Sequence, residues 1–467
     1  MIDVGTADIY SIPPTDAPVP AVARPAKRHI LVFLCTGEGE HDENLDIAAI
    51  HDSPTWSVLE RAIVALPGMP YTALEQFIKN VRGKHDHPYS PLLSTAISIL
   101  HADLWRSWGY MPGVTLGHSS GEAAAAYIAG VFSVEEAVRT AHQLGQAGAE
   151  LSGGMLYTQL RRSEVDAFDS GPDAAPRPTA GEGLCLAAFN SEVSKPGEAE
   201  ELVSVTLSGP EQQLADWLAQ DTKAKKLRPQ RPWHHPAYAT TAGLAMVDGE
   251  AHGLAGGHTA HGLTECSLVS ATTAAVVSTF EADHWQRWLT RPVQFAAACR
   301  VAGRLLLQRA GELPGLAWAA GAPTLVPPVL QPKPVQPALT PSAEQELYEK
   351  LGLTEAFQQP YVAPPAPQGM KPSGEDRGSG CGGGGGDGDG GELGDAVLVE
   401  VGCHPSLLAH AAAMLSASGV RIIAQAASMK RNMPAADFLA AQKARLEVLL
   451  EREATGGGRR APATPQR

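Results

Sequence analysis

Five residues, Gly117 to Gly121 (GHSSG), constrain the fold of this chain more than any other stretch. They lie between an extended apolar run, Val114 to Leu116, and a helix-like run, Glu122 to Ile128. A G-x-S-x-G sequence between a strand and a helix is typical of a nucleophile elbow, in which a sharp turn presents the serine. The N-terminus of the following helix offers unpaired N–H groups to a developing oxyanion. Ser119 is therefore the predicted nucleophile of an α/β fold.

Composition excludes several classes of function. The net charge of −14 argues against a nucleic-acid partner. The six cysteines are widely spaced, which suits a reducing compartment better than a disulfide framework. The longest apolar stretch, 123–132, is too short to span a bilayer, and the first 28 residues lack the apolar segment of a secretory signal. We expect no membrane span and an intracellular location, cytoplasmic or organellar, with a plastid as one option.

The order of predicted elements gives a domain layout. Residues 154–232 predict the order β-α-β-β-α-β, which fits an inserted ferredoxin-like subdomain. The large domain is expected from three segments, 29–153, 233–312 and 394–453. Residues 313–393 are rich in proline and then glycine, a composition that predicts a disordered insertion within the large domain. Residues 1–28 and 454–467 are predicted to be flexible tails.

A serine nucleophile needs a general base, and histidine is the usual choice. Two of the sixteen histidines, His234 and His235, lie in a proline-flanked loop directly after the small subdomain. Spacing alone does not choose between them. His118 neighbours the nucleophile, but the turn is expected to direct its side chain away, as a packing residue.

Two other clusters are candidate binding sites. His252, His258, His261 and Cys266 match no standard zinc spacing, so no metal site is predicted. The segment 222–231 is strongly basic, with Lys223, Lys225, Lys226, Arg228 and Arg231. This pattern is typical either of an exposed edge strand whose lysines prevent pairing with another chain, or of a binding site for phosphates or an acidic carrier domain.

Six separate blocks of the chain resemble one family: LWRSWG (104–109), LGHSSGEAAAAYIAGVFSVEEAVR (116–139), AAFNS (187–191), LSGP (207–210), RPVQF (291–295) and VEVGCHPSL (399–407). The chain is similar, over about residues 29–312 and 395–450, to the acyltransferase domains of polyketide synthases and to malonyl-CoA:acyl-carrier-protein transacylases. The resemblance implies an α/β-hydrolase-like large domain with an inserted ferredoxin-like subdomain.

The resemblance also implies a mechanism. A Ser–His dyad would pass an acyl group from coenzyme A, through an acyl-serine, to the phosphopantetheine arm of an acyl carrier protein, with no bound cofactor. Ser119 matches the nucleophile and His234 the base, because WHHP (233–236) is similar to the family's Phe-His-Ser-Pro. The N–H groups of Ser120 and Glu38 would form the oxyanion hole, and a main-chain carbonyl near Trp288 would orient the histidine. His118 and Asn190 match positions near the substrate.

Three positions depart from the family pattern. Glu38 stands where the family has glutamine, Ser90 where glutamine is frequent, and Leu144 where an arginine clamps the carboxylate of malonyl groups. A buried carboxylate without a cationic partner is costly, and Glu38 would add repulsion. We therefore expect a neutral monocarboxylic acyl group, such as acetyl or fatty acyl; the alternative is that an arginine reaches in from elsewhere.

Two other functions fit the same residues. A hydrolase would use the same dyad to pass the acyl group to water, and elbow and histidine do not separate it from a transferase. A non-catalytic docking module of a synthase would explain the three altered positions, but the retention of Ser119 and His234 speaks against it.

Overall fold

The structure is a computed structural model that describes residues 29–41, 43–169, 183–193, 201–247, 266–312, 395–431 and 433–454. The expectations for residues 1–28, 313–393 and 455–467 lie outside the described residues, as do His252, His258 and His261. Within the described residues, no helix combines the length and the apolar character needed to cross a membrane.

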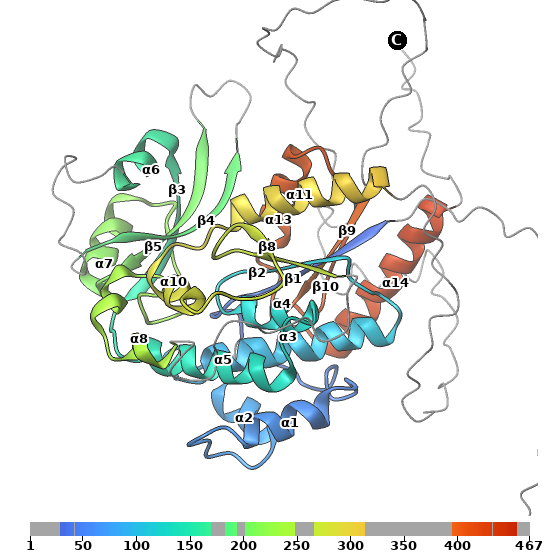
Figure 1. The fold of residues 1–467 in the computed structure, drawn as a ribbon, viewed down its shortest axis with the longest axis horizontal. Helices are drawn as coiled ribbons and strands as arrows, with labels where there is room; N and C mark the ends of the chain where they lie inside the picture. Colours follow the sequence, from blue (N-terminus) through green and yellow to red (C-terminus); the bar gives the residue numbers. More distant parts are fainter. Residues whose placement is uncertain are drawn as a thin grey trace, which may run out of the picture.

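A six-stranded sheet lies at the centre of the molecule (Figure 1). Its order is β10-β9-β1-β2-β7-β8, and all neighbours pair in parallel except β8, which is antiparallel to β7. Parallel strands covered on both faces read as continuous apolar runs, which is why 29–35 (HILVFLC) predicted a buried strand. The strands are β1 (Ile30–Cys35), β2 (Val114–Gly117), β7 (Ser267–Ser270), β8 (Ala275–Val277), β9 (Asp395–Val401) and β10 (Arg421–Ala427).

Helices cover both faces of this sheet and divide its core into two clusters (Figure 1). One face packs against α3 (Ser90–Ser107), α4 (Gly121–Ile128) and α5 (Val134–Gly148), with α1 (Trp56–Val64) and α2 (Leu74–Val81) outside them. The other face packs against α11 (Phe295–Glu312) and α13 (Leu408–Ala417), while α14 (Ala435–Ala454) packs on β10. The spacing Ser133-x-x-Glu136 predicts a capping box, and the two residues form one at the start of α5.

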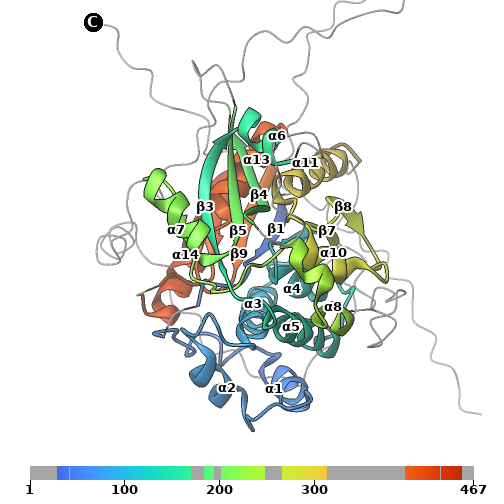
Figure 2. The same ribbon diagram turned by 90° about the vertical axis from the view of Figure 1, so that its left-hand side faces the viewer.

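A second, four-stranded sheet lies beside the first (Figure 2). Its antiparallel order, β4-β5-β3-β6, is that of a ferredoxin-like subdomain, as the sequence predicted. Main-chain hydrogen bonds of 2.8 Å from Phe189 to Val293 and from Val293 to Ala187 join its edge strand to the large domain. The elements are β3 (Gly154–Arg161), α6 (Arg162–Asp169), β4 (Cys185–Val193), β5 (Leu202–Gly209), α7 (Glu211–Gln220) and β6 (Lys225–Lys226).

Some local predictions were wrong. The sequence of 237–248 predicts one helix, but the structure has two short pieces, the 3₁₀-helix η1 (Pro236–Thr240) and α8 (Gly243–Met246), separated by Thr241 and Ala242. The β-branched residues of 267–278 predict one extended segment, but the structure has a hairpin that turns at Ala274, whose φ is +50°. The sequence of 283–307 predicts helices broken at Pro292, and this is confirmed, since α10 (His284–Thr290) ends before it and α11 begins after it.

Candidate active site

Ser119 occupies a strained turn between β2 and α4. Its φ is +52°, in the left-handed region that non-glycine residues rarely adopt. The flanking glycines are required because a Cβ on Gly117 would lie 2.3 Å from the nitrogen of Glu122, and one on Gly121 would lie 2.3 Å from the oxygen of Cys35. The turn therefore has the strand–turn–helix geometry of the predicted nucleophile elbow.

His234 lies directly against this serine. Its Nε2 is 2.7 Å from Oγ of Ser119, and its Nδ1 is 2.6 Å from the main-chain oxygen of Trp288. Because a carbonyl only accepts, Nδ1 carries the proton and donates it to Trp288, which leaves the Nε2 lone pair for the serine hydroxyl. The geometry thus brings together two residues that are far apart in sequence and gives the histidine the tautomer of a general base.

Burial controls the charge of this base. His234 is 1% exposed, and burial lowers its pKa to about 3, although the hydrogen bond to the Trp288 carbonyl acts in the opposite direction. The imidazole is therefore neutral at physiological pH and able to accept a proton. His235 serves another purpose, since it donates to Gly183 through Nε2 (2.8 Å) and accepts from the nitrogen of Ala237 through Nδ1 (3.1 Å).

Two main-chain N–H groups are available beside the nucleophile. Among the described residues, the nitrogens of Ser120 and Glu38 donate to no main-chain or side-chain acceptor. The loop after β1 packs tightly on the elbow, because a Cβ on Gly37 would lie 2.8 Å from the oxygen of His118 and 3.1 Å from Cβ of Ser119. This close approach suits an oxyanion hole formed by the two predicted N–H groups.

The main-chain carbonyl of Trp288 orients His234 as expected, but the sequence did not predict the roles of the Trp288 indole and of Glu122. The indole Nε1 of Trp288 donates to the main-chain oxygen of Ser119 at 3.0 Å. The carboxylate of Glu122 accepts from Ser270 and from Thr272 (2.6 Å) and lies 3.2 Å from Nε2 of His284 on α10. Burial alone would raise the pKa of Glu122, but His284 and these hydrogen bonds lower it below its usual value. The carboxylate therefore links α4 to the helix that supplies Trp288.

His118 and Asn190 contact each other across the two sheets. Nε2 of His118 lies 2.8 Å from Oδ1 of Asn190, whose Nδ2 donates to Thr206 at 3.1 Å. Burial lowers the pKa of His118 to about 4, so its ring is neutral and donates to Asn190. These bonds tie the elbow to β4 and β5. The substrate-binding role expected for the two residues stays a prediction.

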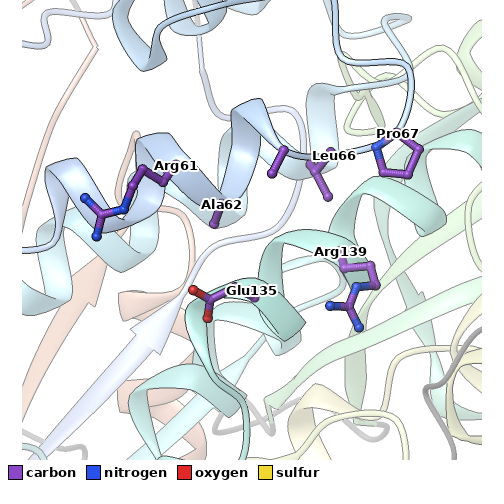
Figure 3. A pocket seen from close by; sticks show the side chains of 7 residues that line it. Arg61, Ala62, Leu66, Pro67, Glu135 and Arg139 are labelled. Atoms are coloured by element: carbon purple, nitrogen blue, oxygen red, sulfur yellow. The ribbon is translucent and has the colours of Figure 1, made fainter.

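Leu144 is fully buried in the apolar stripe of α5. The arginine on the same helix, Arg139, lines a surface cavity of 310 Å³ between α1 and α5 together with Arg61 and Glu135 (Figure 3). None of the proposed catalytic residues lines this cavity. Helix α5 therefore supplies no guanidinium to the site at the position of Leu144.

Ser90 and Glu38 form a buried polar corner. Gly83 donates to Nδ1 of His41 at 3.1 Å, so Nε2 of His41 carries the proton that it donates to Ser90 at 2.8 Å. Burial raises the pKa of Glu38 to about 8, with the nearby Ser90, Arg231 and Trp233 acting in the opposite direction. The carboxyl is largely protonated at neutral pH, so the repulsion expected from Glu38 arises only above about pH 8.

The sequence prediction groups Arg231 with the exposed basic residues, but the structure buries it. Lys223, Lys225, Lys226 and Arg228 are exposed, as expected for a surface patch, and Lys226 forms an ion pair with Glu211. Arg231 instead is only 6% exposed and donates to the main-chain oxygens of Gly145 (3.1 Å) and Asp86. Spacing within a basic run does not distinguish its buried member from its exposed ones.

Metal binding has no support in the described residues, where no group of three or more histidine, cysteine, aspartate or glutamate side chains could hold an ion. Cys266 belonged to the candidate cluster, whose histidines are not described.

Comparison with known proteins identifies one domain type within the chain. Residues 90–306 match the model of the acyl transferase domain. The chain is 29% identical over 294 residues to the highly reducing polyketide synthase resH of Aspergillus sclerotiorum and 30% identical over 306 residues to acrA of Aspergillus aculeatus. Each alignment covers 60% of this chain but only 11% and 12% of the relative, so the chain spans about a tenth of the length of these synthases.

Solved structures of such domains share the fold. The acyltransferase domain from module 8 of the salinomycin polyketide synthase matches with a TM-score of 0.55 and 19% identity, over 93% of this chain and 77% of that one. A loading acyltransferase from the avermectin synthase matches with 0.54 and 18%, over 89% and 99%. The organellar location that the sequence left open, with a plastid as one option, finds no support in the structure or in these fungal relatives. Over residues 90–306 the chain therefore contains an acyl transferase domain, which is similar in sequence and fold to the acyltransferase domains of polyketide synthases.

Proposed function

We propose that this protein transfers an acyl group from an acyl-CoA, through an ester on Ser119, to the phosphopantetheine thiol of an acyl carrier protein in polyketide or fatty acid biosynthesis. One observation carries the proposal: Oγ of Ser119 lies 2.7 Å from Nε2 of His234, whose other nitrogen is fixed by the Trp288 carbonyl at 2.6 Å. A neutral, oriented imidazole against a strained serine is the arrangement that nucleophilic acyl transfer requires.

In the first half-reaction, Oγ attacks the thioester carbonyl while Nε2 of His234 takes the hydroxyl proton. The N–H groups of Ser120 and Glu38 stabilise the negative charge that develops on the carbonyl oxygen. The C–S bond then breaks, and the departing thiolate takes the proton from His234 to leave as coenzyme A. The products are free coenzyme A and an ester on Ser119.

The second half-reaction reverses these roles. His234 takes the proton of the pantetheine thiol, the sulfur attacks the ester carbonyl, and Ser119 recovers the proton as it departs. The new thioester lies on the carrier protein, and the site returns to its starting state without a bound cofactor.

The acyl group in this proposal is a neutral monocarboxylic one, and Leu144 supports it. A fully buried leucine offers no hydrogen bond or charge to a second carboxylate, and an unpaired buried carboxylate is costly. Acetyl and fatty acyl groups carry no such charge.

The exposed basic strip Lys223, Lys225, Lys226 and Arg228 supports the choice of partners. Against a net charge of −14, these residues form a local positive surface on β6 of the small subdomain and on both sides of it in sequence. The phosphates of coenzyme A or an acidic carrier surface would be attracted to it.

Release of coenzyme A from a panel of acyl-CoAs, with and without carrier protein, tests the proposal. We expect release to become catalytic only with the carrier, and Ser119→Ala to abolish it. Catalytic release without carrier would indicate a hydrolase on the same dyad. Binding of the carrier without release from any donor would indicate a non-catalytic docking module.

A further inference from the structure

Three loops leave the central sheet at the edge where the nucleophile elbow lies. Strands β10, β9, β1 and β2 are parallel neighbours (Figure 1), and the carboxyl ends of β9, β1 and β2 are level in register. The loops 36–41 after β1, 402–407 after β9 and 428–431 after β10 therefore begin at the same edge as the elbow. In open α/β sheets this edge is where binding sites form. The loop after β1 carries the N–H of Glu38.

Arg431 connects the loops after β10 and β1, although β9 separates the two strands. Its Nε donates to the main-chain oxygen of Glu40 at 3.2 Å, and its Nη2 donates to the carboxylate of the same residue. Its main-chain nitrogen donates to Nδ1 of His404, in the loop after β9, at 3.3 Å. The side chains of Arg431 and Glu40 are only 23% and 22% exposed. A partly buried fork of two donors on one residue fixes the position of that residue as well as its charge.

The carboxyl of Glu40 depends on this guanidinium. Burial raises the pKa of Glu40, and Arg431, Arg228 and Ser406 act in the opposite direction. Among the described residues, Arg431 is the only cation that hydrogen-bonds Glu40. Without Arg431, a partly buried carboxylate would lose its charged partner, and the loop would shift to expose that carboxylate to water.

Glu38 lies between two anchored points of the loop after β1. On one side, Gly37 packs on the elbow, so closely that an added Cβ would clash with it. On the other side, Glu40 is held by the guanidinium. Gly39, between them, has a φ of +97° and packs on Pro229. Because a glycine restrains its own backbone little, the Glu38 N–H takes its position from these surrounding contacts.

We propose that Arg431 is a positioning residue of the oxyanion hole, which holds the loop after β1 so that the N–H of Glu38 points at the developing oxyanion. It acts through Glu40 and touches neither the acyl group nor the reacting atoms. A donor to the oxyanion contributes more in the transition state than in the bound substrate, so its displacement lowers the rate of transfer more than the affinity for acyl-CoA. This inference rests on the proposed function and names a residue on which its chemical steps depend.

The variant Arg431→Met tests the inference, because it keeps a similar length of side chain and removes both donors. Single-turnover loading of acetyl-CoA gives a maximal rate and a half-saturating concentration, and intact mass gives the fraction of protein that loads. We expect the maximal rate of that fraction to fall about tenfold to a hundredfold, while the half-saturating concentration stays within about twofold. Arg431→Lys keeps the charge but not the fork, and it should recover part of the rate.

The carbonyl of the acyl-enzyme reports on the oxyanion hole directly. Hydrogen bonds to a carbonyl oxygen lower its stretching frequency, so the isotope-labelled acetyl ester on Ser119 senses the N–H groups of Glu38 and Ser120 in infrared difference spectra. The ester band of Arg431→Met should lie at a higher frequency than the wild-type band. A loss of stability alone would not move this band.

Arg421→Met is the matched control. Arg421 binds Asp395 through Nε (2.6 Å) and Nη2, and this pair joins β10 to β9 at their amino ends, on the opposite edge of the sheet. The variant should leave the maximal rate and the ester band unchanged. Glu40→Leu removes the carboxylate that Arg431 binds. The double variant with Arg431→Met should lose little more rate than Arg431→Met alone, because both changes act through one contact.

An unchanged ester band or an unchanged maximal rate in Arg431→Met would overturn the inference and leave the proposed function standing. Equal rate losses in Arg431→Met and Arg421→Met would also overturn it, because the ion pair would then only stabilise the fold. A wild-type protein that forms no acetyl ester would contradict the proposed function itself, and the inference with it.

Discussion

The main-chain oxygen of Trp288 lies 2.6 Å from Nδ1 of His234, while the indole of the same tryptophan donates to the main-chain oxygen of Ser119 at 3.0 Å. One residue therefore orients the base and anchors the strained nucleophile turn. A neutral carbonyl replaces the carboxylate of a catalytic triad, so the imidazolium formed during reaction has a dipole, and not a charge, as its partner.

Replacing Trp288 by phenylalanine separates these two contacts. Trp288→Phe removes the indole donor but keeps the main-chain carbonyl that orients His234. We expect a stability loss of about 1 kcal/mol, because one net hydrogen bond is lost, and a loading rate reduced by up to about tenfold through a less fixed serine. Thermal unfolding and single-turnover loading measure the two effects. Loading lowered by a thousandfold would show that the indole does more than hold the turn.

The low pKa of His234 predicts an unusual pH profile. An ordinary histidine base loses activity as pH falls through about 6.5, but burial lowers the pKa of this one to about 3. The base therefore stays competent above that value, and acyl-CoA loading at pH 5.5 should nearly match loading at pH 7.5. A base of ordinary pKa would lose about tenfold over this interval. Single-turnover loading with circular dichroism at each pH decides between the two.

Glu122 is predicted to act as a positioning residue. Glu122→Gln removes the charge that pairs with His284 on α10, the helix whose Trp288 carbonyl orients His234. We expect a loss of about 3 kcal/mol in stability and a loading rate lowered about tenfold to a hundredfold, with little change in KM for acyl-CoA.

Asp103→Asn provides the matched control for Glu122→Gln. Asp103 is also buried, accepts from Thr55 and Tyr127 and pairs with Arg106, but it contacts none of the proposed catalytic residues. It should destabilise the protein without lowering the loading rate of the folded fraction. Equal losses of loading rate in both variants would show that Glu122 has only a structural role.

His101 is predicted to limit stability in acid. It is fully buried in α3, neither ring nitrogen has a hydrogen-bond partner among the described residues, and burial lowers its pKa to about 3. Below its unfolded value of about 6.5, only the unfolded chain takes up the proton, so stability falls as pH decreases. The cost reaches about 2 kcal/mol at pH 5.

The variant His101→Leu removes this proton uptake and fills a similar volume. Between pH 7 and pH 5 it should lose about 2 kcal/mol less stability than the wild-type protein, as measured by urea unfolding at both values. Identical losses in the two proteins would show that His101 is solvated or partnered in solution.

The sequence predicted the elements whose determinants are local. The elbow, the capping box at Ser133 and the antiparallel order of the small subdomain follow from glycine placement, side-chain chemistry and alternation along short segments. It missed α2 and α13. Helix α13 (LAHAAAMLSA) is nearly apolar throughout because it is buried against α11 and the sheet, so it shows no amphipathic stripe.

The candidate site is formed by tertiary contacts that the spacing of residues in the sequence does not reveal. His234 and His235 were equivalent in sequence until the family resemblance chose between them, and in the structure only His234 reaches Ser119. Arg231 was grouped with exposed lysines because a basic run does not reveal which member turns inward. The charge of Glu38 follows from burial, which is a tertiary property.

The most direct test of the account is to locate the acyl group on the protein. Wild-type protein is mixed with acetyl-CoA, quenched in acid within seconds and digested, and the modified peptide is sequenced by mass spectrometry. We predict one acetyl group on Ser119, lost on addition of carrier protein and absent from Ser119→Ala. An acyl group on another residue, or an adduct that persists in Ser119→Ala, would contradict transfer through the Ser119–His234 dyad.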